Sequence, residues 1–259
     1  MVSIHTMLLI SSIFQVTHSQ VESMIKGERD FQHYLKLDDM ALTPSGVPIL
    51  KGITMKKGKL DLLPFNYALN FPKNERKDKV VHFFLADYLF ERCWNQLDKQ
   101  AELLKQFKAV LQPDFSMYTD MPKPMQQWQH YRKMFVSAYW QSKGIRVIPT
   151  PGWSTPDSYE WCFEGMPTGS MVVVSSVGCS KNPEAKRLFE MGYREMLKRL
   201  EPAQIVWYGK VPEWLEEKPI AVFENSSQTR FTTAKIKKQT DELLLGAGIP
   251  KVERRLLHG

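Results

Sequence analysis

Short apolar runs alternate with longer segments of helical period from about Val80 onward. The runs that begin near residues 80, 109, 146, 171, 204 and 220 have the length and composition of buried strands. Most gaps between them leave room for a crossover helix, and crossover connections join parallel strands. The pattern therefore predicts an α/β fold with a mostly parallel sheet.

Apolar residues at helical spacing predict three of the crossover helices. The first begins at about Leu97. The second carries an aromatic stripe and runs from Asp120, its expected N-cap, to Gly144. The third has a broad apolar stripe, begins at Asn182 and ends before Pro202, because proline cannot continue a helix.

The number of strands limits the architecture. A complete eight-stranded (βα) barrel typically needs about 250 residues, and the region with strand signals is shorter. We therefore expect a partial or irregular barrel, unless residues 40–79 supply further strands from "VPILKGITM" or "LLPFNYAL". A doubly wound open sheet is the alternative architecture.

The character of the chain divides it into three parts. Residues 1–40 are expected to be a leader or dispensable extension, residues 41–225 a single α/β domain, and residues 226–259 a basic tail. The stretch "MLLISSIFQV" resembles the core of a secretory signal. No Lys or Arg precedes Lys26, however, and the stretch is too short to span a bilayer. We expect a cytoplasmic protein, with secretion as the alternative.

The charge of the chain indicates which classes of partner it favours. The formal net charge is +7, and from Arg230 onward seven basic residues stand against three acidic ones. This balance favours nucleotides, nucleic acid or another polyanion as a partner, although a solvated basic surface fits equally well.

The three cysteines form no CxxC pair, which argues against a disulfide framework and a zinc ribbon.

The expected carboxyl ends of the strands supply the candidate catalytic residues, because ligands bind there in parallel α/β folds. Asp87, Asp114 and Glu224 follow three strands and could together hold a divalent metal or divide acid and base roles. Ser175 and Tyr208 would position the substrate. Capping of local turns is the alternative role for each carboxylate.

Two further features could bind a cofactor or substrate. Ser176 and Gly178 lie in the small-residue turn "SSVGCSKNPE" before a helix, where backbone N–H groups could bind phosphate. The turn lacks both standard phosphate-loop motifs, so a plain strand-to-helix turn is the alternative. Trp153 and Trp161 lie in an aromatic, loop-like insertion that could stack a base or form a local core.

Several blocks, in this order along the chain, resemble one family: "HFFLADYLFERCWN", "VLQPDFSMYTDMP", "QQWQHYRKMFVSAYWQSKGIRVIPTPGW" and "SYEWCFEGMPTGSMVVVSSVG". It is the bacterial and phage family of domain of unknown function 4417. The resemblance covers about residues 62–209 and implies a mobile-element setting and a cytoplasmic protein, without an established activity. The family's first block tends to read HFF-x-DDY, and here Ala86 replaces the first Asp.

The sequence thus leaves two hypotheses. In the first, an α/β protein of phage type binds or hydrolyses a nucleotide or nucleic-acid phosphate at the carboxyl end of its sheet. In the second, a non-catalytic module binds a host or phage protein, or nucleic acid, through the basic tail and the aromatic insertion. Neither hypothesis includes a membrane partner.

Overall fold

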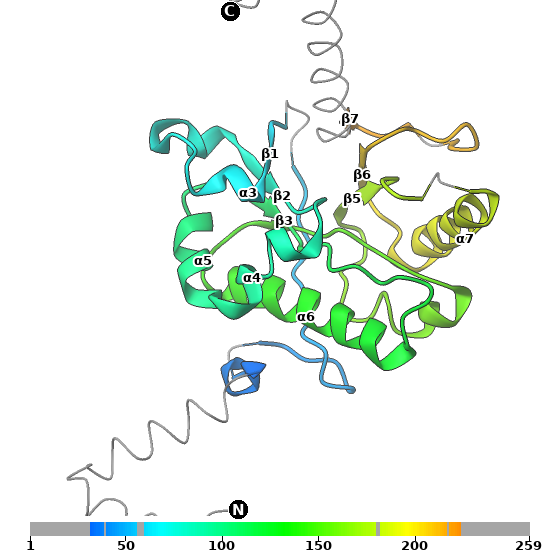
Figure 1. The fold of residues 1–259 in the computed structure, drawn as a ribbon, viewed down its shortest axis with the longest axis horizontal. Helices are drawn as coiled ribbons and strands as arrows, with labels where there is room; N and C mark the ends of the chain where they lie inside the picture. The colour runs from blue at the N-terminus through cyan, green and yellow to red at the C-terminus, as the bar shows by residue number, and fades with distance from the viewer. Residues whose placement is uncertain (1–31, 39, 56–59, 180–181, 217, 224–259) are drawn as a thin grey trace, which may run out of the picture.

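The computed structural model describes residues 32–38, 40–55, 60–179, 182–216 and 218–223. Its strands form two parallel sheets in which spatial order follows sequence order (Figure 1). The first sheet contains β1 (Leu62–Pro64), β2 (Val80–His82), β3 (Ala109–Leu111) and β4 (Val147–Ile148), and the second contains β5 (Met171–Ser175), β6 (Gln204–Tyr208) and β7 (Ala221–Phe223). The predicted α/β fold with parallel strands is confirmed.

The two sheets meet and curve around a common interior. The backbone N–H of Val173 in β5 donates a hydrogen bond to the carbonyl of Pro149, just after β4, at 2.9 Å. Across the interior, the ring of Tyr208 in β6 lies 5.0 Å from that of His82 in β2. Within the described chain the strands do not close, so the architecture is a partial barrel. The strand order also lacks the reversal that defines the doubly wound alternative.

Helices connect most neighbouring strands. The α-helices are α3 (Phe65–Ala68), α4 (Arg92–Asn95), α5 (Leu97–Leu104), α6 (Lys123–Ser142) and α7 (Pro183–Leu200), and the 3-10 helices are η2 (Tyr34–Lys36), η3 (Lys73–Asp78), η4 (Asp87–Leu89) and η5 (Pro156–Glu160). In chain order, α4 and α5 lie between β2 and β3, α6 between β3 and β4, and α7 between β5 and β6. Nowhere in the described segments is a helix long and apolar enough to cross a membrane.

Two local predictions need correction. Asp120 is not the N-cap of α6, because the helix begins after Pro122, whose fixed backbone geometry sets the start without a side-chain cap. Of the two candidate strands in residues 40–79, "LLPFNYAL" supplies β1 and α3. The other, "VPILKGITM", contributes single backbone contacts, including the bond from Met171 N–H to the carbonyl of Ile53.

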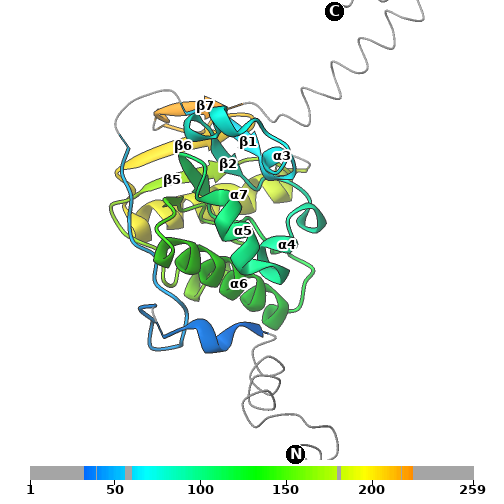
Figure 2. The ribbon, with the colours of Figure 1, turned by 90° about the vertical axis from the view of Figure 1, so that its left-hand side faces the viewer.

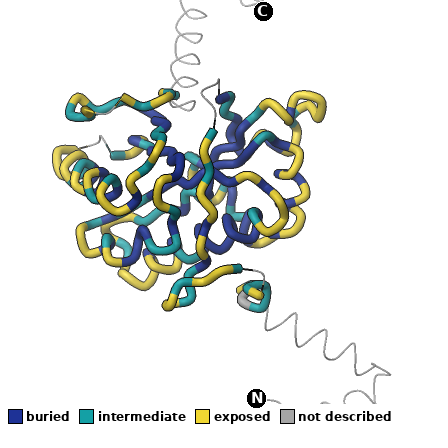
Figure 3. The backbone as a smooth tube through the Cα atoms, turned by 180° about the vertical axis from the view of Figure 1, so that it is seen from behind, coloured by how far each residue is buried: buried dark blue, intermediate teal, exposed yellow. Residues whose placement is uncertain are grey.

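Side-chain alternation along β5 and β6 divides the interior into two cores. Met171, Val173 and Val206 belong to the cluster inside the curved sheets, whereas Val172 and Trp207 pack with residues of α7. This follows from the period of two along a strand, which sends neighbouring side chains to opposite faces. The most buried backbone accordingly lies centrally, with exposed segments around it (Figure 3).

The first described residues run along one side of the domain, past α6 toward the strands (Figure 2). His33 contacts the ring and the carbonyl oxygen of Trp94, and Lys36 forms an ion pair with Asp98 at 2.8 Å. Further along, the backbone of Lys51 makes two hydrogen bonds with the side chain of Gln141 in α6. Part of the segment expected to be dispensable therefore contacts α4 and α5, and the predicted tail, 226–259, lies outside the described residues.

One glycine of α7 makes room for a tryptophan. A Cβ atom placed on Gly192 would lie 2.1 Å from Cδ1 of Trp153, far inside van der Waals contact. The indole of Trp153 stacks on Phe189, with ring centroids 5.4 Å apart. Gly192 therefore fixes how closely Trp153 approaches the helix.

Replacing Gly192 with Ala is expected to destabilise the protein, although the same change in an exposed helix stabilises by about 1 kcal/mol. The added methyl group would force Trp153 out of place, and overpacking of this kind costs about 1–3 kcal/mol. Urea unfolding measures the difference. Gly52→Ala is the control, because its Cβ would meet neighbours at an ordinary 3.5 Å. A Gly192→Ala protein more stable than wild type would contradict this packing.

Candidate functional site

A pocket of about 350 Å³ lies at the carboxyl ends of the strands. Segments that follow β3, β4 and β5 form its walls together with the first turns of α7. Its aromatic lining consists of Phe84, Phe115, Tyr118, Trp153 and Phe189. Its polar lining includes Asp114, Ser116, Thr119, Ser154 and Ser175. We call it the Asp114 pocket, since Asp114 is the charged residue in its lining.

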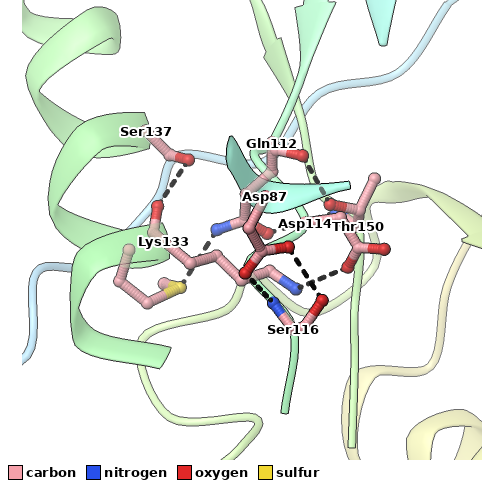
Figure 4. A network of polar contacts seen from close by, with 8 residues as sticks. Asp87, Gln112, Asp114, Ser116, Lys133, Ser137 and Thr150 are labelled. Atoms are coloured by element: carbon pink, nitrogen blue, oxygen red, sulfur yellow. Dashed lines mark hydrogen bonds and ion pairs between the residues drawn. The ribbon is translucent and has the colours of Figure 1, made fainter. Parts of the chain in front are cut away.

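An ion pair with a buried lysine backs the pocket. Lys133 projects from α6, and its Nζ lies 3.9 Å from Oδ1 of Asp114 (Figure 4). Only 1 % of the Lys133 side chain is exposed, compared with 37 % of the Asp114 side chain. The lysine is thus sealed behind the wall that carries Asp114, and the carboxylate faces the pocket.

Lys133 belongs to a buried polar stripe on α6. Gln126, His130, Lys133 and Ser137 recur at helical spacing, and each is buried. His130 Nε2 donates to the carbonyl of Glu164 at 3.0 Å, and the Ser137 hydroxyl donates to the carbonyl of Lys133 at 2.7 Å. Sequence reasoning missed Lys133 because the aromatic stripe of the same helix drew attention. The polar residues at positions 126, 130, 133 and 137 are the signal that could have found it.

Gly152 allows the wall to close over this pair. A Cβ atom at Gly152 would lie 3.3 Å from Lys133 Nζ and 3.8 Å from Asp114 Oδ1. The first distance is tighter than an ordinary contact, so any side chain here would press on the ammonium group. Thr150, two residues earlier, bonds through its hydroxyl to the carbonyl of Gln112 at 2.9 Å and so ties the ends of β3 and β4 together.

Burial pushes both charged groups toward their neutral forms. It raises the pKa of Asp114, an effect that Lys133 opposes and the nearby Asp87 carboxylate adds to. It lowers the pKa of Lys133, and here Asp114 provides the opposing influence. Burial, helped by Lys133, also lowers the pKa of His130 to about 4, so this imidazole is neutral at neutral pH. Opposed shifts beside a pocket are a physical mark of functional sites.

Asp87 has a different role from Asp114. Its two carboxylate oxygens accept hydrogen bonds from the backbone N–H of Ser116 at 3.0 Å and from the Ser116 hydroxyl at 2.8 Å (Figure 4). These bonds join the segment after β2 to the segment after β3. Asp87 therefore holds the loop that follows Asp114, and it does not line the pocket.

The remaining predicted catalytic residues are Ser175, Tyr208 and Glu224. Ser175 lines the pocket, and its hydroxyl accepts from the backbone N–H of Val177 at 3.2 Å. Tyr208 is buried inside the curved sheets, where its ring stacks on Phe84 with centroids 4.7 Å apart. Glu224 lies outside the described residues. Ser175 thus lines the same pocket as Asp114, and Tyr208 contacts Phe84 of its lining.

Two of the four predicted cofactor-binding residues line the pocket. Trp153 and Gly178 line the pocket, as expected for a ligand site at the strand ends. Ser176 and Trp161 do not line it. The Ser176 hydroxyl donates to the carbonyl of Lys210 at 2.7 Å, and Trp161 packs in the second core. The aromatic insertion therefore forms a local core at Trp161 and a pocket wall at Trp153.

The metal site formed by Asp87, Asp114 and Glu224 stays a prediction. No group of three His, Cys, Asp or Glu residues suited to a metal ion occurs in the part of the chain that the structure describes. Of the two carboxylates that the structure describes, Asp114 lines the pocket, and Asp87 accepts two hydrogen bonds from Ser116 outside the lining. Glu224 lies outside the described residues.

Comparison with known proteins places this site in a family. Residues 40–226 match the family model described as domain of unknown function (DUF4417). The chain belongs to this family. The DUF4417 match contains both members of the ion pair and every residue that lines the pocket. The sequence-based resemblance is confirmed.

The related proteins come from bacteriophages. Over 148 residues the chain is 42% identical to the Gene 1 protein of Mycobacterium phage L5, an alignment that covers 56% of this chain and 65% of the relative. Over 161 residues it is 38% identical to the Gene 1 protein of Mycobacterium phage D29, covering 58% and 60%. The DUF4417 chain thus spans less than two thirds of these relatives. No solved structure gives a significant match.

Asp114→Asn is expected to lower the free energy of unfolding of this DUF4417 protein by about 3 kcal/mol at neutral pH, because it leaves the buried Lys133 ammonium unpaired. Burial already lowers the pKa of Lys133, so the unfolded chain binds more protons and stability rises with pH through that window. Without Asp114 the pKa of Lys133 falls further. The loss of unfolding free energy caused by Asp114→Asn should therefore shrink as pH rises toward about 10. Urea unfolding at several pH values measures it.

A control variant and a double variant test the physical reason for this loss of stability. Asp61→Asn removes an acid from the pair with Lys79, but that acid is 46 % exposed, so a loss below about 1 kcal/mol is expected. Asp114→Asn combined with Lys133→Met removes both buried charges and should recover most of the stability. A deficit for Asp114→Asn that is as small as the control's, or that does not change with pH, would contradict the account.

Proposed function

We propose that this DUF4417 protein binds a nucleotide in the Asp114 pocket. The observation that carries the proposal is a pocket of about 350 Å³ at the carboxyl ends of parallel strands, lined by aromatic rings and one carboxylate. This volume and this mixture of apolar walls with few polar groups are typical of small-ligand sites. The rings supply flat surfaces on which a base can stack.

The pocket lining contains groups suited to the base and to the phosphate of a nucleotide. Asp114 can accept hydrogen bonds from a base, whereas the N–H and the hydroxyl of Ser116 already donate to Asp87. Ser175 and Gly178, which belong to the small-residue turn before α7, also line the pocket, as does Ala185 of the first turn of that helix. The positive end of α7 favours phosphate there, although the N–H groups of Val177, Cys179 and Ala185 already donate to other atoms of the chain.

A nucleic-acid strand is the second candidate ligand, and two exposed rings favour it. Tyr118 lines the pocket and is 60% exposed, while Tyr88, just after Asp87, is 80% exposed. Rings of this kind stack neighbouring bases of a single strand. The net charge of +7 supports either anionic ligand.

Isothermal titration of the full chain with AMP, GMP, CMP and UMP, and with a short single-stranded oligonucleotide, tests the proposal. At least one nucleotide should bind with 1:1 stoichiometry. Ala185→Trp, which fills the pocket, should weaken that binding at least about tenfold. Binding of oligonucleotide alone would favour the second candidate.

Met191→Trp is the matched control. Met191 lies on the same helix, is exposed, and is not part of the pocket lining. Its substitution should leave affinity unchanged, and melting curves of both variants check that each is folded. Equal affinity of the Ala185→Trp and wild-type proteins would place binding elsewhere and refute the proposal.

A further inference from the structure

The carboxylate of Asp114 has unused hydrogen-bonding capacity. Among the described residues none donates a hydrogen bond to it, and Lys133 Nζ lies 3.9 Å away, beyond hydrogen-bond distance. Both oxygens of the neighbouring Asp87, by contrast, are occupied by Ser116. Asp114, which lines the pocket, therefore keeps acceptor capacity on its carboxylate for a ligand there.

We propose that the base selected by the pocket is guanine, an inference that rests on the nucleotide-binding function proposed above. An ionised carboxylate only accepts hydrogen bonds, and its two oxygens match two donors side by side. Guanine presents such a pair in its N1–H and its exocyclic 2-amino group. Asp114 can accept from both at once.

The other bases place an acceptor against the carboxylate. Adenine and cytosine each present one amino group beside a ring nitrogen acceptor, and uracil presents one N–H between two carbonyl oxygens. Hypoxanthine keeps the N1–H of guanine but lacks the 2-amino group. Each of these bases loses at least one charge-assisted hydrogen bond to Asp114, and some bring a lone pair against it.

The charge of Lys133 argues against a cationic ligand with the same donor pair, such as a guanidinium group. Lys133 and Asp114 together are close to neutral, so the pair does not attract a cation. A guanidinium ion held by Asp114 would also face the Lys133 ammonium from the other side of the carboxylate. A neutral base carrying a negative phosphate avoids this repulsion.

The aromatic lining is compatible with a purine. Trp153 and Phe115 both line the pocket with Asp114. Trp153 is held by its stack on Phe189 and by its close approach to Gly192. A ring held in this way can receive a flat base without losing side-chain freedom on binding.

Titration of the full wild-type chain with GMP, IMP, AMP, XMP and arginine amide tests the inference. GMP should bind at least about tenfold more tightly than IMP or AMP, because a site built for a donor rejects the analogue that lacks it. Equal affinity for all the nucleotides would overturn guanine selection and leave the proposed function standing. Binding of none would overturn both, and arginine amide binding as tightly as GMP would overturn the choice of a base.

A double variant then tests Asp114 as the residue that reads the base. Asp114→Asn combined with Lys133→Met turns one acceptor into a donor without leaving a buried ammonium unpaired. Xanthine presents N1–H beside a carbonyl oxygen, which matches the asparagine amide. The double variant should therefore prefer XMP to GMP, reversing the wild-type order.

The control removes the same two charges at the opposite end of the strands. Asp61 and Lys79 precede β1 and β2 and form an ion pair at 2.5 Å. Asp61→Asn combined with Lys79→Met should keep the wild-type preference for GMP. If the Asp114 double variant also keeps it, Asp114 does not read the base, and the inference is wrong.

Discussion

The burial of the Lys133 ammonium group is the constraint on which the site depends. An unpaired charge in an apolar interior is strongly unfavourable, so the surrounding chain must supply a counter-charge. It must also leave room for the ammonium group. Asp114 supplies the charge at 3.9 Å, and Gly152 leaves the space. The ends of β3 and β4 are in this way held against α6 at the point where the pocket opens.

The same constraint gives the pocket its chemistry. Because Lys133 is sealed behind the wall, its charge acts on the ligand through Asp114 and not by direct contact. Ser116 remains bonded to Asp87, which fixes the loop without occupying Asp114. The result is an anchored carboxylate with free acceptor oxygens among aromatic rings. Such preorganisation favours ligands that present donors in a matching arrangement.

Much of the fold was predictable because strand burial leaves a strong pattern. The strands at Val80, Ala109, Met171 and Gln204 begin where the apolar runs begin, and the helix from Pro183 follows its apolar stripe. The carboxyl-end rule, which needs no motif, also selected Asp114, Trp153, Ser175 and Gly178, all of which line the pocket. Local periodicity carries this information directly.

The rest depended on contacts between distant segments. The side chain of Tyr208 faces the interior because of the register of β6. The hydrogen bond between Ser116 and Asp87 joins residues that are 29 positions apart. Lys133 stands in a polar stripe that the sequence shows, but its pairing with Asp114 appears only in the fold. A 13C NMR titration of the Asp114 carboxyl, with and without GMP, tests whether this carboxylate binds the base. Bound donors should lower the Asp114 pKa from its raised value in the free protein, and a pKa unchanged by saturating GMP would show that Asp114 does not accept from the base.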